Sequence, residues 1–166
     1  MKNLISLAAL IGTMFSASPL WAHGSEEHEQ KGKHVISTDQ ALFGREGDPK
    51  KATRTIKITM DDTMRYTPDT ISVKQGETIR LVIENKGKTL HELVMGSEKE
   101  LKEHAELMKK FPDMEHSAPY MAHVGTGKQR EIIWEFNRPG DVLFGCLMPG
   151  HYEAGMAGKI TVTPKA

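Results

Sequence analysis

The sequence predicts an all-β domain folded as a β-sandwich, and two features of the chain support this fold class. Short segments in which apolar and polar residues alternate recur along the chain, separated by turns that contain Gly, Pro and Asn. Helical segments do not alternate with these strands, which argues against a parallel α/β architecture. With 166 residues, the chain is long enough for one domain with its own hydrophobic core.

The first expected strand, residues 53–60, places Ile56, Ile58 and Met60 on one face, as a half-buried strand does. The same pattern and the flanking turns predict the other strands. These lie at residues 70–73, 77–84, 91–95, 129–136, 141–146 and 159–163. Short strands joined by Gly and Pro turns are typical of a sandwich.

One segment is expected to be helical. Ser97 and Glu100 have the spacing of a capping box, in which each side chain bonds the backbone of the other residue. The helix then carries its apolar side chains on one face, at Leu101, Ala105 and Met108. Pro112 ends it, and a loop is expected as far as about Gly125. Residues 97–125 are therefore expected to be an insertion in the β domain, between the strand of His91 and the strand of Trp134, from where it could lie over one end of the sandwich.

Three segments are expected along the chain. Residues 1–22 have a basic start, a short apolar stretch and a small final residue, which is the pattern of a cleaved signal peptide. The alternative is an uncleaved N-terminal anchor, although the apolar stretch is too short to span a bilayer. Residues 23–50 are mostly polar, with an apolar island at 41–43, and are expected to form a flexible tail. Residues 51–166 are expected to form the domain of an exported, periplasmic protein.

The charge balance argues against nucleic acid as a partner. Basic and acidic residues both number 22, and no basic stripe is present. After cleavage of the leader, no stable insertion into a membrane is expected. The chain has one Cys, so an exported form cannot contain an internal disulfide. Cys146 is therefore a buried free thiol, half of an intermolecular bridge, or a metal ligand.

The sequence around Cys146 favours the metal ligand. Cys146, His151 and Met156 place a thiol, an imidazole and a thioether on one short loop that also contains Pro149 and Gly150. Two His and one Cys in a plane, with a weakly bound axial Met, are the donors of a blue-copper electron-transfer site. The second His is expected to be His91, at the start of an apolar strand. Core packing is the alternative role for both His91 and Met156.

The order of one distant His followed by a Cys, His and Met loop resembles that of the cupredoxins. Residues 66–85, 140–146 and 156–162 also resemble the cupredoxin strands on either side of the ligands, so the similarity covers about residues 53–163. The Cys-x4-His-x4-Met spacing is similar to the loop of rusticyanin and auracyanin. The resemblance implies a Greek-key sandwich, a type 1 copper cofactor bound by His91, Cys146, His151 and Met156, and no catalytic residue.

Two positions depart from the cupredoxin pattern. Many family members have Asn or Ser after the first His, where the side chain steadies the Cys loop, but this chain has Glu92. The azurin group has Gly before that His, which supplies a carbonyl ligand, whereas this chain has Leu90. The colour and potential of the site therefore do not follow from the resemblance.

Two functions are compatible with these donors. The first resembles that of periplasmic cupredoxins for copper tolerance, which bind copper or oxidise Cu(I) by one-electron transfer. The second is a one-electron carrier between redox partner proteins. An oxidase would need a further copper, because a type 1 site has no open position for dioxygen. Zinc sites use other donor sets, and a Cys hydrolase would leave the Met and the Pro-Gly-His loop without a role.

Additional soft donors favour copper tolerance. The insertion repeats the spacing Met-x-His, at Met114 and His116 and again at Met121 and His123. The tail contributes His23, His28 and His34. Thioethers prefer Cu(I), so the repeat is interpreted as a hypothetical extra copper site, with simple packing as the alternative. If cleavage exposes His23, its amine and imidazole could also chelate Cu(II).

Overall fold

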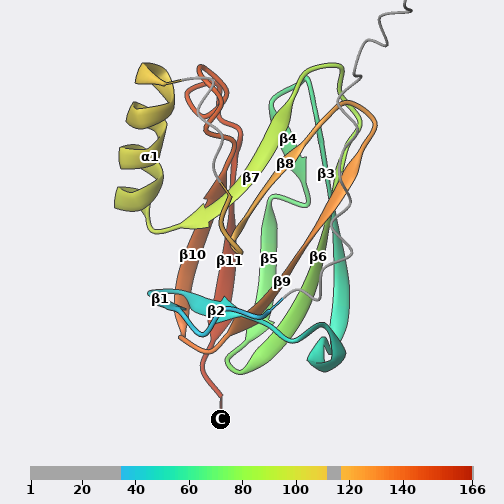
Figure 1. Cartoon of the computed structure of the whole chain (residues 1–166), viewed down its shortest axis with the longest axis vertical. Coiled ribbons are helices and arrows are strands. Elements are labelled where there is room, and N and C mark those ends of the chain that lie inside the picture. Colours follow the sequence, from blue (N-terminus) through green and yellow to red (C-terminus); the bar gives the residue numbers. More distant parts are fainter. Residues whose placement is uncertain (1–34, 112–116, 166) are drawn as a thin grey trace, which may run out of the picture. The chain divides into compact units, whose positions relative to one another are not determined.

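The computed structural model describes residues 35–111 and 117–165, and in these ranges two β-sheets pack face to face (Figure 1). The larger sheet has the strand order β1-β2-β9-β6-β3-β4. Its strands are β1 (Gln40–Ala41), β2 (Gly44–Glu46), β3 (Arg54–Asp61), β4 (Arg65–Thr67), β6 (Glu77–Asn85) and β9 (Gln129–Phe136). A short 3-10 helix, η1 (Pro49–Lys51), joins β2 to β3.

The smaller sheet has the strand order β5-β11-β10-β7-β8. Its strands are β5 (Thr70–Lys74), β7 (His91–Gly96), β8 (Met121–Val124), β10 (Gly140–Gly145) and β11 (Ala157–Thr163). Most neighbours in the two sheets are antiparallel, while β3 with β6 and β5 with β11 are parallel. The predicted all-β sandwich is confirmed, and each strand expected from residue alternation is present.

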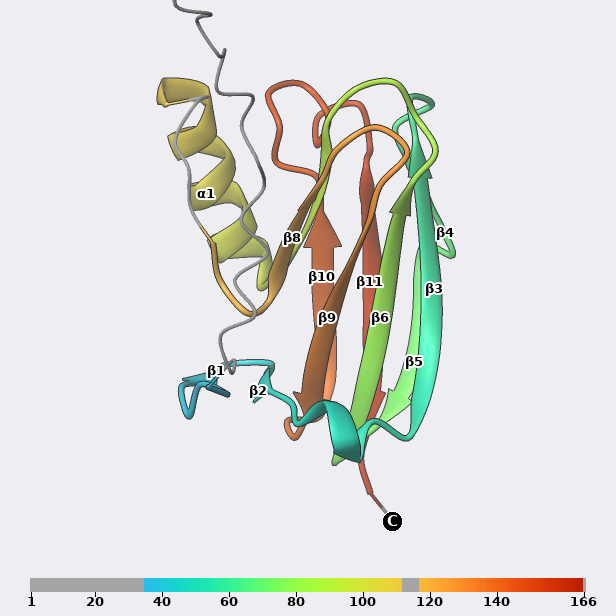
Figure 2. The same cartoon turned by 45° about the vertical axis from the view of Figure 1, so that its right-hand side comes forward.

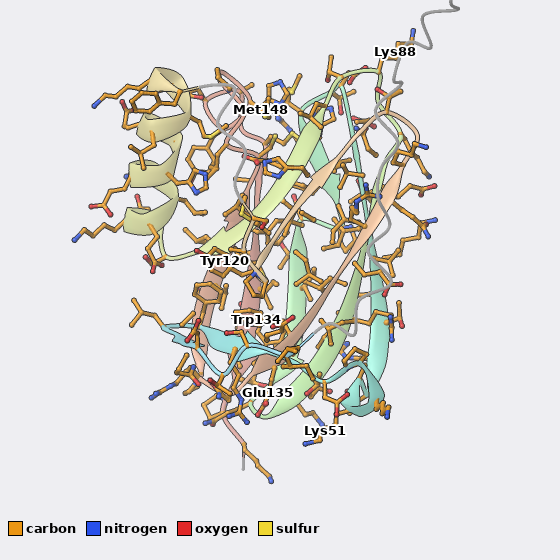
Figure 3. The ribbon with its side chains drawn as sticks, in the orientation of Figure 1. Lys51, Lys88, Tyr120, Trp134, Glu135 and Met148 are labelled. Carbon is orange, nitrogen blue, oxygen red and sulfur yellow. The ribbon has the colours of Figure 1, made fainter. Side chains whose placement is uncertain are left out.

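The core lies between the two sheets and is built from the inward residues of each strand. Among its largest fully buried side chains are Ile58, Trp134, Phe136 and Phe144. Trp134 stacks on Phe43 with ring centroids 5.3 Å apart, and Figure 3 shows Trp134 inside the sandwich. Burying one large apolar side chain contributes about 1.5–3 kcal/mol to folding, so this aromatic contact stabilises the end of the sandwich where it lies.

The N-terminal part of the domain differs from the expected tail over residues 23–50. Residues 40–46 form β1 and β2, and β2 pairs with β9 of the larger sheet. Phe43, in the apolar island noted in the sequence, is only 7% exposed because it packs on Trp134. These strands have two and three residues, too few for alternation to reveal them. The expected segments at residues 1–22 and 23–34 lie outside the described residues.

Helix α1 (Glu98–Lys110) begins and ends close to the predicted positions. Ser97 and Glu100 form the expected capping box, with Ser97 N–H donating to Glu100 Oε2 at 2.8 Å. The predicted apolar face of α1 packs against Val94 and Leu147 on the outer face of the smaller sheet. Figure 2 shows α1 beside the sandwich and not across its end. Neither helix in the described ranges is long and apolar enough to cross a membrane.

Residues 121–124 also differ from the expectation, because they form strand β8 where a loop was predicted. β8 pairs antiparallel with β7, and Glu92 lies opposite His123 in the register. Ala122 and Val124 face the core, while His123 points to the outer face. Every residue of β7 is consequently buried, because the core covers one face and α1 with the neighbouring segments covers the other.

Candidate metal centre

Strand pairing brings together residues that are far apart in the sequence. His91 is the first residue of β7, and Cys146 directly follows the last residue of β10. These strands are antiparallel, with Gly145 opposite Val94, so the start of β7 lies beside the end of β10. His151 reaches the same place from the loop between β10 and β11. The smaller sheet thus supplies a rigid support for the three side chains at one end of the sandwich.

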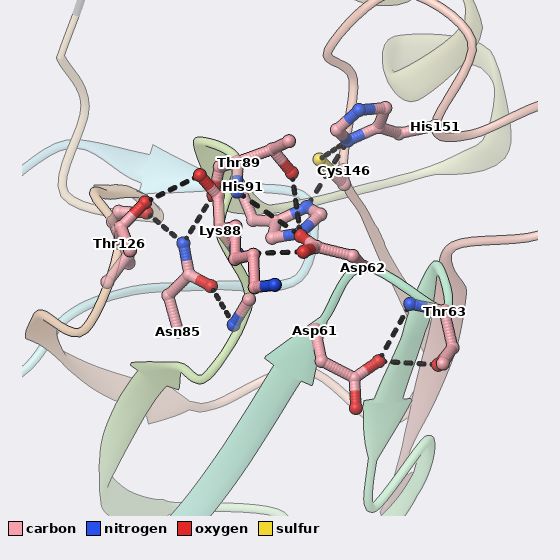
Figure 4. Close-up of polar contacts among 12 residues, drawn as sticks. Asp61, Asp62, Thr63, Asn85, Lys88, Thr89, His91, Thr126, Cys146 and His151 are labelled. Atoms are coloured by element: carbon pink, nitrogen blue, oxygen red, sulfur yellow. Dashed lines mark hydrogen bonds and ion pairs between the residues drawn. The ribbon is translucent and has the colours of Figure 1, made fainter.

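His91, Cys146 and His151 meet at this end (Figure 4). His91 Nδ1 lies 3.3 Å from His151 Nδ1, and Cys146 Sγ lies 3.2 Å from the same nitrogen. One donor atom from each residue falls within 4.8 Å of the others. Cys146 and His91 are fully buried, whereas His151 is half-buried and reaches solvent. Three donors that converge in this way can share one metal ion.

Met156 closes the loop that carries two of these donors. Its carbonyl oxygen accepts the N–H of Cys146 at 3.1 Å, and its own N–H donates to the His151 carbonyl at 3.0 Å. Its side chain is fully buried in the same core cluster as Cys146. Gly150 and Gly155 have φ of +85° and +90°, which L side chains rarely adopt, so glycine allows the loop to turn back on itself.

Asp62 orients the imidazole of His91, and the sequence analysis did not identify it. His91 Nε2 lies 3.1 Å from Asp62 Oδ1 and 3.2 Å from the hydroxyl of Thr89. Hydrogen bonds from the Lys88 N–H and the Thr89 hydroxyl hold the pKa of Asp62 well below its usual range. The ionised carboxylate favours a proton on Nε2 and so leaves Nδ1 free to face Cys146 and His151.

Comparisons with known proteins agree with this geometry. A family model described as a cupredoxin-like domain matches residues 13–114. A copper-resistant cuproprotein, CopI of Rubrivivax gelatinosus, is 44% identical over 96% of this chain and 94% of its own. The chain belongs to the cupredoxin family. CopI of Pseudomonas aeruginosa is 32% identical over 98% of this chain and 95% of its own length.

A solved structure gives the same result for the fold. Auracyanin from Roseiflexus castenholzii, in its dithionite-reduced form, superimposes with a TM-score of 0.59 at 26% identity. The match covers 68% of this chain and 99% of the auracyanin. The two sheets of this chain, of which the smaller carries His91, Cys146 and His151, therefore have the fold of this auracyanin.

Glu92, one of the two positions at which the sequence departs from the cupredoxin pattern, has a fully buried side chain. Its Oε1 accepts the N–H of Leu147, the residue after Cys146, at 2.8 Å. Its backbone N–H points to Cys146 Sγ at 3.5 Å, and its carbonyl accepts the Tyr66 hydroxyl at 2.6 Å. The Glu92 side chain thereby fixes the backbone of the loop that carries Cys146.

The electrostatics of the site favour different protonation states for its donors. Burial, with the nearby Glu92 carboxylate, raises the pKa of the Cys146 thiol to about 12. The thiol therefore keeps its proton at neutral pH until a metal displaces it. Burial and the neighbouring His91 lower the pKa of His151, which leaves this imidazole neutral with a lone pair available for a metal.

The additional soft donors fall into two groups. Met121 and His123 lie on β8, where Met121 packs against the cluster beneath α1 and His123 contacts the Glu92 carboxylate. Both side chains are half-buried. Both residues of this second Met-x-His pair therefore have contacts within the domain, and the sequence did not indicate either contact. The remaining donors, Met114, His116, His23, His28 and His34, lie outside the described residues.

Proposed function

We propose that this protein binds copper at a type 1 site and contributes to copper tolerance in the bacterial periplasm. His91, Cys146 and His151 would be the strong ligands, and Met156 the weak axial ligand. The observation that carries the proposal is the convergence of a buried thiol with two imidazoles at one end of the sandwich. The relatives from Rubrivivax gelatinosus and Pseudomonas aeruginosa, named as copper-resistant cuproproteins, support the assignment to tolerance.

The chemistry of the donors fits copper better than zinc. Structural zinc sites favour several thiolates, and catalytic zinc sites combine His or carboxylate ligands with an open position. One thiolate, two imidazoles and a thioether instead suit copper in either oxidation state. Bound copper would supply one-electron exchange between Cu(I) and Cu(II).

Residues around the proposed ligands hold them in position for that exchange of an electron. Asp62 holds the His91 ring, Glu92 holds the Cys146 loop, and the two sheets bury both ligands away from water. Because these contacts lie within a packed sandwich, the donors have little freedom to rearrange when the charge of the metal changes. A site of this kind binds copper tightly and transfers an electron with little structural change.

Export belongs to the same proposal. Residues 1–22 have the pattern of a signal peptide, and a copper-tolerance function is most useful in the compartment that external copper reaches first. The test is to express the full chain and sequence the N-terminus of the mature protein. A start at His23 in the periplasmic fraction agrees with the proposal, and an intact leader in the cytoplasm contradicts it.

One observation favours electron transfer between proteins as a second function. His151 is the half-buried member of the three, and Met148 lies at the same end of the molecule (Figure 3). Leu90, next to His91 in the chain, is 43% exposed. A partly apolar surface around a solvent-accessible ligand is suited to brief contact with a redox partner protein.

Growth and metal content test the two functions together. A strain lacking this protein is complemented with the parent or with Cys146→Ser and grown in rising copper, while copper per chain is counted on the purified proteins. The proposal expects bound copper and protection from the parent, and neither from Cys146→Ser. Bound copper without protection would favour the electron carrier, and a parent without copper would contradict both functions.

A further inference from the structure

Glu92 and His123 form a contact across two strands at the metal site. They lie opposite each other in the antiparallel register of β7 and β8. Their neighbours His91, Ala122 and Val124 point inward, so both side chains project from the outer face of the sheet. Glu92 Oε2 lies 2.7 Å from His123 Nε2. This pairing requires strand β8, which belongs to the insertion.

The two oxygens of Glu92 have separate partners. Oε1 accepts the backbone N–H of Leu147 at 2.8 Å, and Oε2 contacts His123. A fully buried carboxylate is costly unless its charge is paired, and His123 lies at ion-pair distance from Oε2. The His123 side chain is 33% exposed, so its outer edge reaches water while its Nε2 is directed inward. The Glu92 carboxylate raises the pKa of His123, in agreement with an ion pair.

We propose that His123, on the insertion strand β8, is a positioning residue that orients the buried Glu92 carboxylate beside the Cys146 loop and balances its charge. The pair thus couples the insertion strand β8 to the metal centre. The proposal rests on the proposed copper site for its effect on potential, while the contact itself exists without copper.

Two physical consequences follow. The bond from Leu147 fixes the backbone immediately after Cys146, and the Glu92 N–H, 3.5 Å from Sγ, fixes the sulfur from the other side. The carboxylate also places a negative charge nearer the site than the positive charge of His123. Negative charge favours the more highly charged oxidised metal. A glutamine at position 92 would keep the bond to Leu147 and remove only the charge.

The first test is the reduction potential of the copper-loaded protein. Glu92→Gln should retain copper and raise the potential, because a nearby negative charge is lost. His123→Gln keeps a donor toward Glu92 but removes the positive charge, so its potential should fall. Glu135→Gln is the matched control, since Glu135 pairs with Arg45 at the opposite end of the sandwich (Figure 3) and should leave the potential unchanged.

The second test uses apo protein and does not depend on copper. Glu92→Gln and His123→Gln should each lower the melting temperature, and the double variant should lower it by less than the sum. Additive losses would show that the two residues do not act as a pair. If either single variant left the potential of the parent unchanged, the tuning role would be overturned. A parent that binds no copper would refute the proposed function, whereas the apo measurements would still decide whether the pair exists.

Discussion

The two ends of the sandwich are held together by different interactions. At one end Phe43 stacks on Trp134, and the Trp134 Nε1–H adds a hydrogen bond to the Phe43 carbonyl at 3.3 Å. At the other end the fully buried groups include His91, Glu92 and Cys146, each with polar contacts. Burying polar groups costs free energy that apolar packing avoids, so the second end is arranged for chemistry at some expense of stability. Substitutions at the end that carries Cys146 should therefore change mainly metal binding, and substitutions at the end that carries Phe43 should change mainly the free energy of unfolding.

The largest effect is expected from Cys146→Ala. The variant removes the thiolate, so the intense sulfur-to-copper absorption of the oxidised protein should disappear and tight copper binding should be lost. The apo domain should still fold, because Ala is small and apolar in a buried position. Visible absorption and copper content measure the first effect, and circular dichroism measures the second. An intense visible band in the variant would exclude Cys146 as the ligand.

Phe43→Ala should show the opposite behaviour. Removing a buried aromatic side chain costs about 3–5 kcal/mol, so the free energy of unfolding of the apo protein should fall by that order. The copper spectrum of the folded variant should match that of the parent, because Phe43 packs on Trp134 and Tyr120, which are not ligands. Denaturant titration of the apo protein measures the loss. An unchanged unfolding midpoint would mean that β1 and β2 contribute nothing to the domain.

Asp62→Ala is expected to weaken copper binding with a smaller effect on the fold. Without the carboxylate, the His91 ring loses the partner that sets its tautomer, and the affinity for copper should fall about 10- to 100-fold. The matched control is Asp61→Ala. Asp61 is next in the chain but bonds Thr63 and does not contact His91. Competition with a chelator measures both affinities, and equal losses in the two variants would contradict the role of Asp62.

The smallest effect concerns pH and the pair formed by Glu92 and His123. The carboxylate raises the pKa of His123 in the folded state, so the folded protein binds its proton more tightly than the unfolded chain. The resulting stability is fully present below the unfolded pKa of about 6.5 and is lost as pH rises through the folded pKa. The difference in apo unfolding free energy between the parent and His123→Gln should shrink from pH 6 to pH 9. A difference that is constant or grows over this range would contradict the ion pair.

The sequence was sufficient where structure depends on local pattern. Alternation gave the long strands, and Ser97 with Glu100 gave the start of α1, because both signals lie within a few neighbouring residues. The loop from Cys146 to Met156 was recognisable for the same reason, together with its resemblance to cupredoxins. The structure brings His91 to this loop, as expected from the resemblance, and places Met156 at its close.

The sequence was insufficient where a contact depends on tertiary pairing. Asp62 reaches His91 from the turn between β3 and β4, and nothing in its own neighbourhood indicates a metal site. His123 contacts Glu92 only because β8 pairs with β7, and β8 was expected to be a loop. The apolar island that contains Phe43 was visible in the sequence, but the strands on either side of it, β1 and β2, are too short to show alternation. These contacts become visible only when the register of the sheets is known.

X-ray absorption at the copper K-edge of the loaded parent protein tests the central claim most directly. Copper should have one sulfur and two nitrogens as its close neighbours, from Cys146, His91 and His151. Any copper that Cys146→Ala retains should have no close sulfur neighbour. A parent spectrum with only nitrogen and oxygen neighbours would contradict the claim that the three residues at this end of the sandwich bind copper.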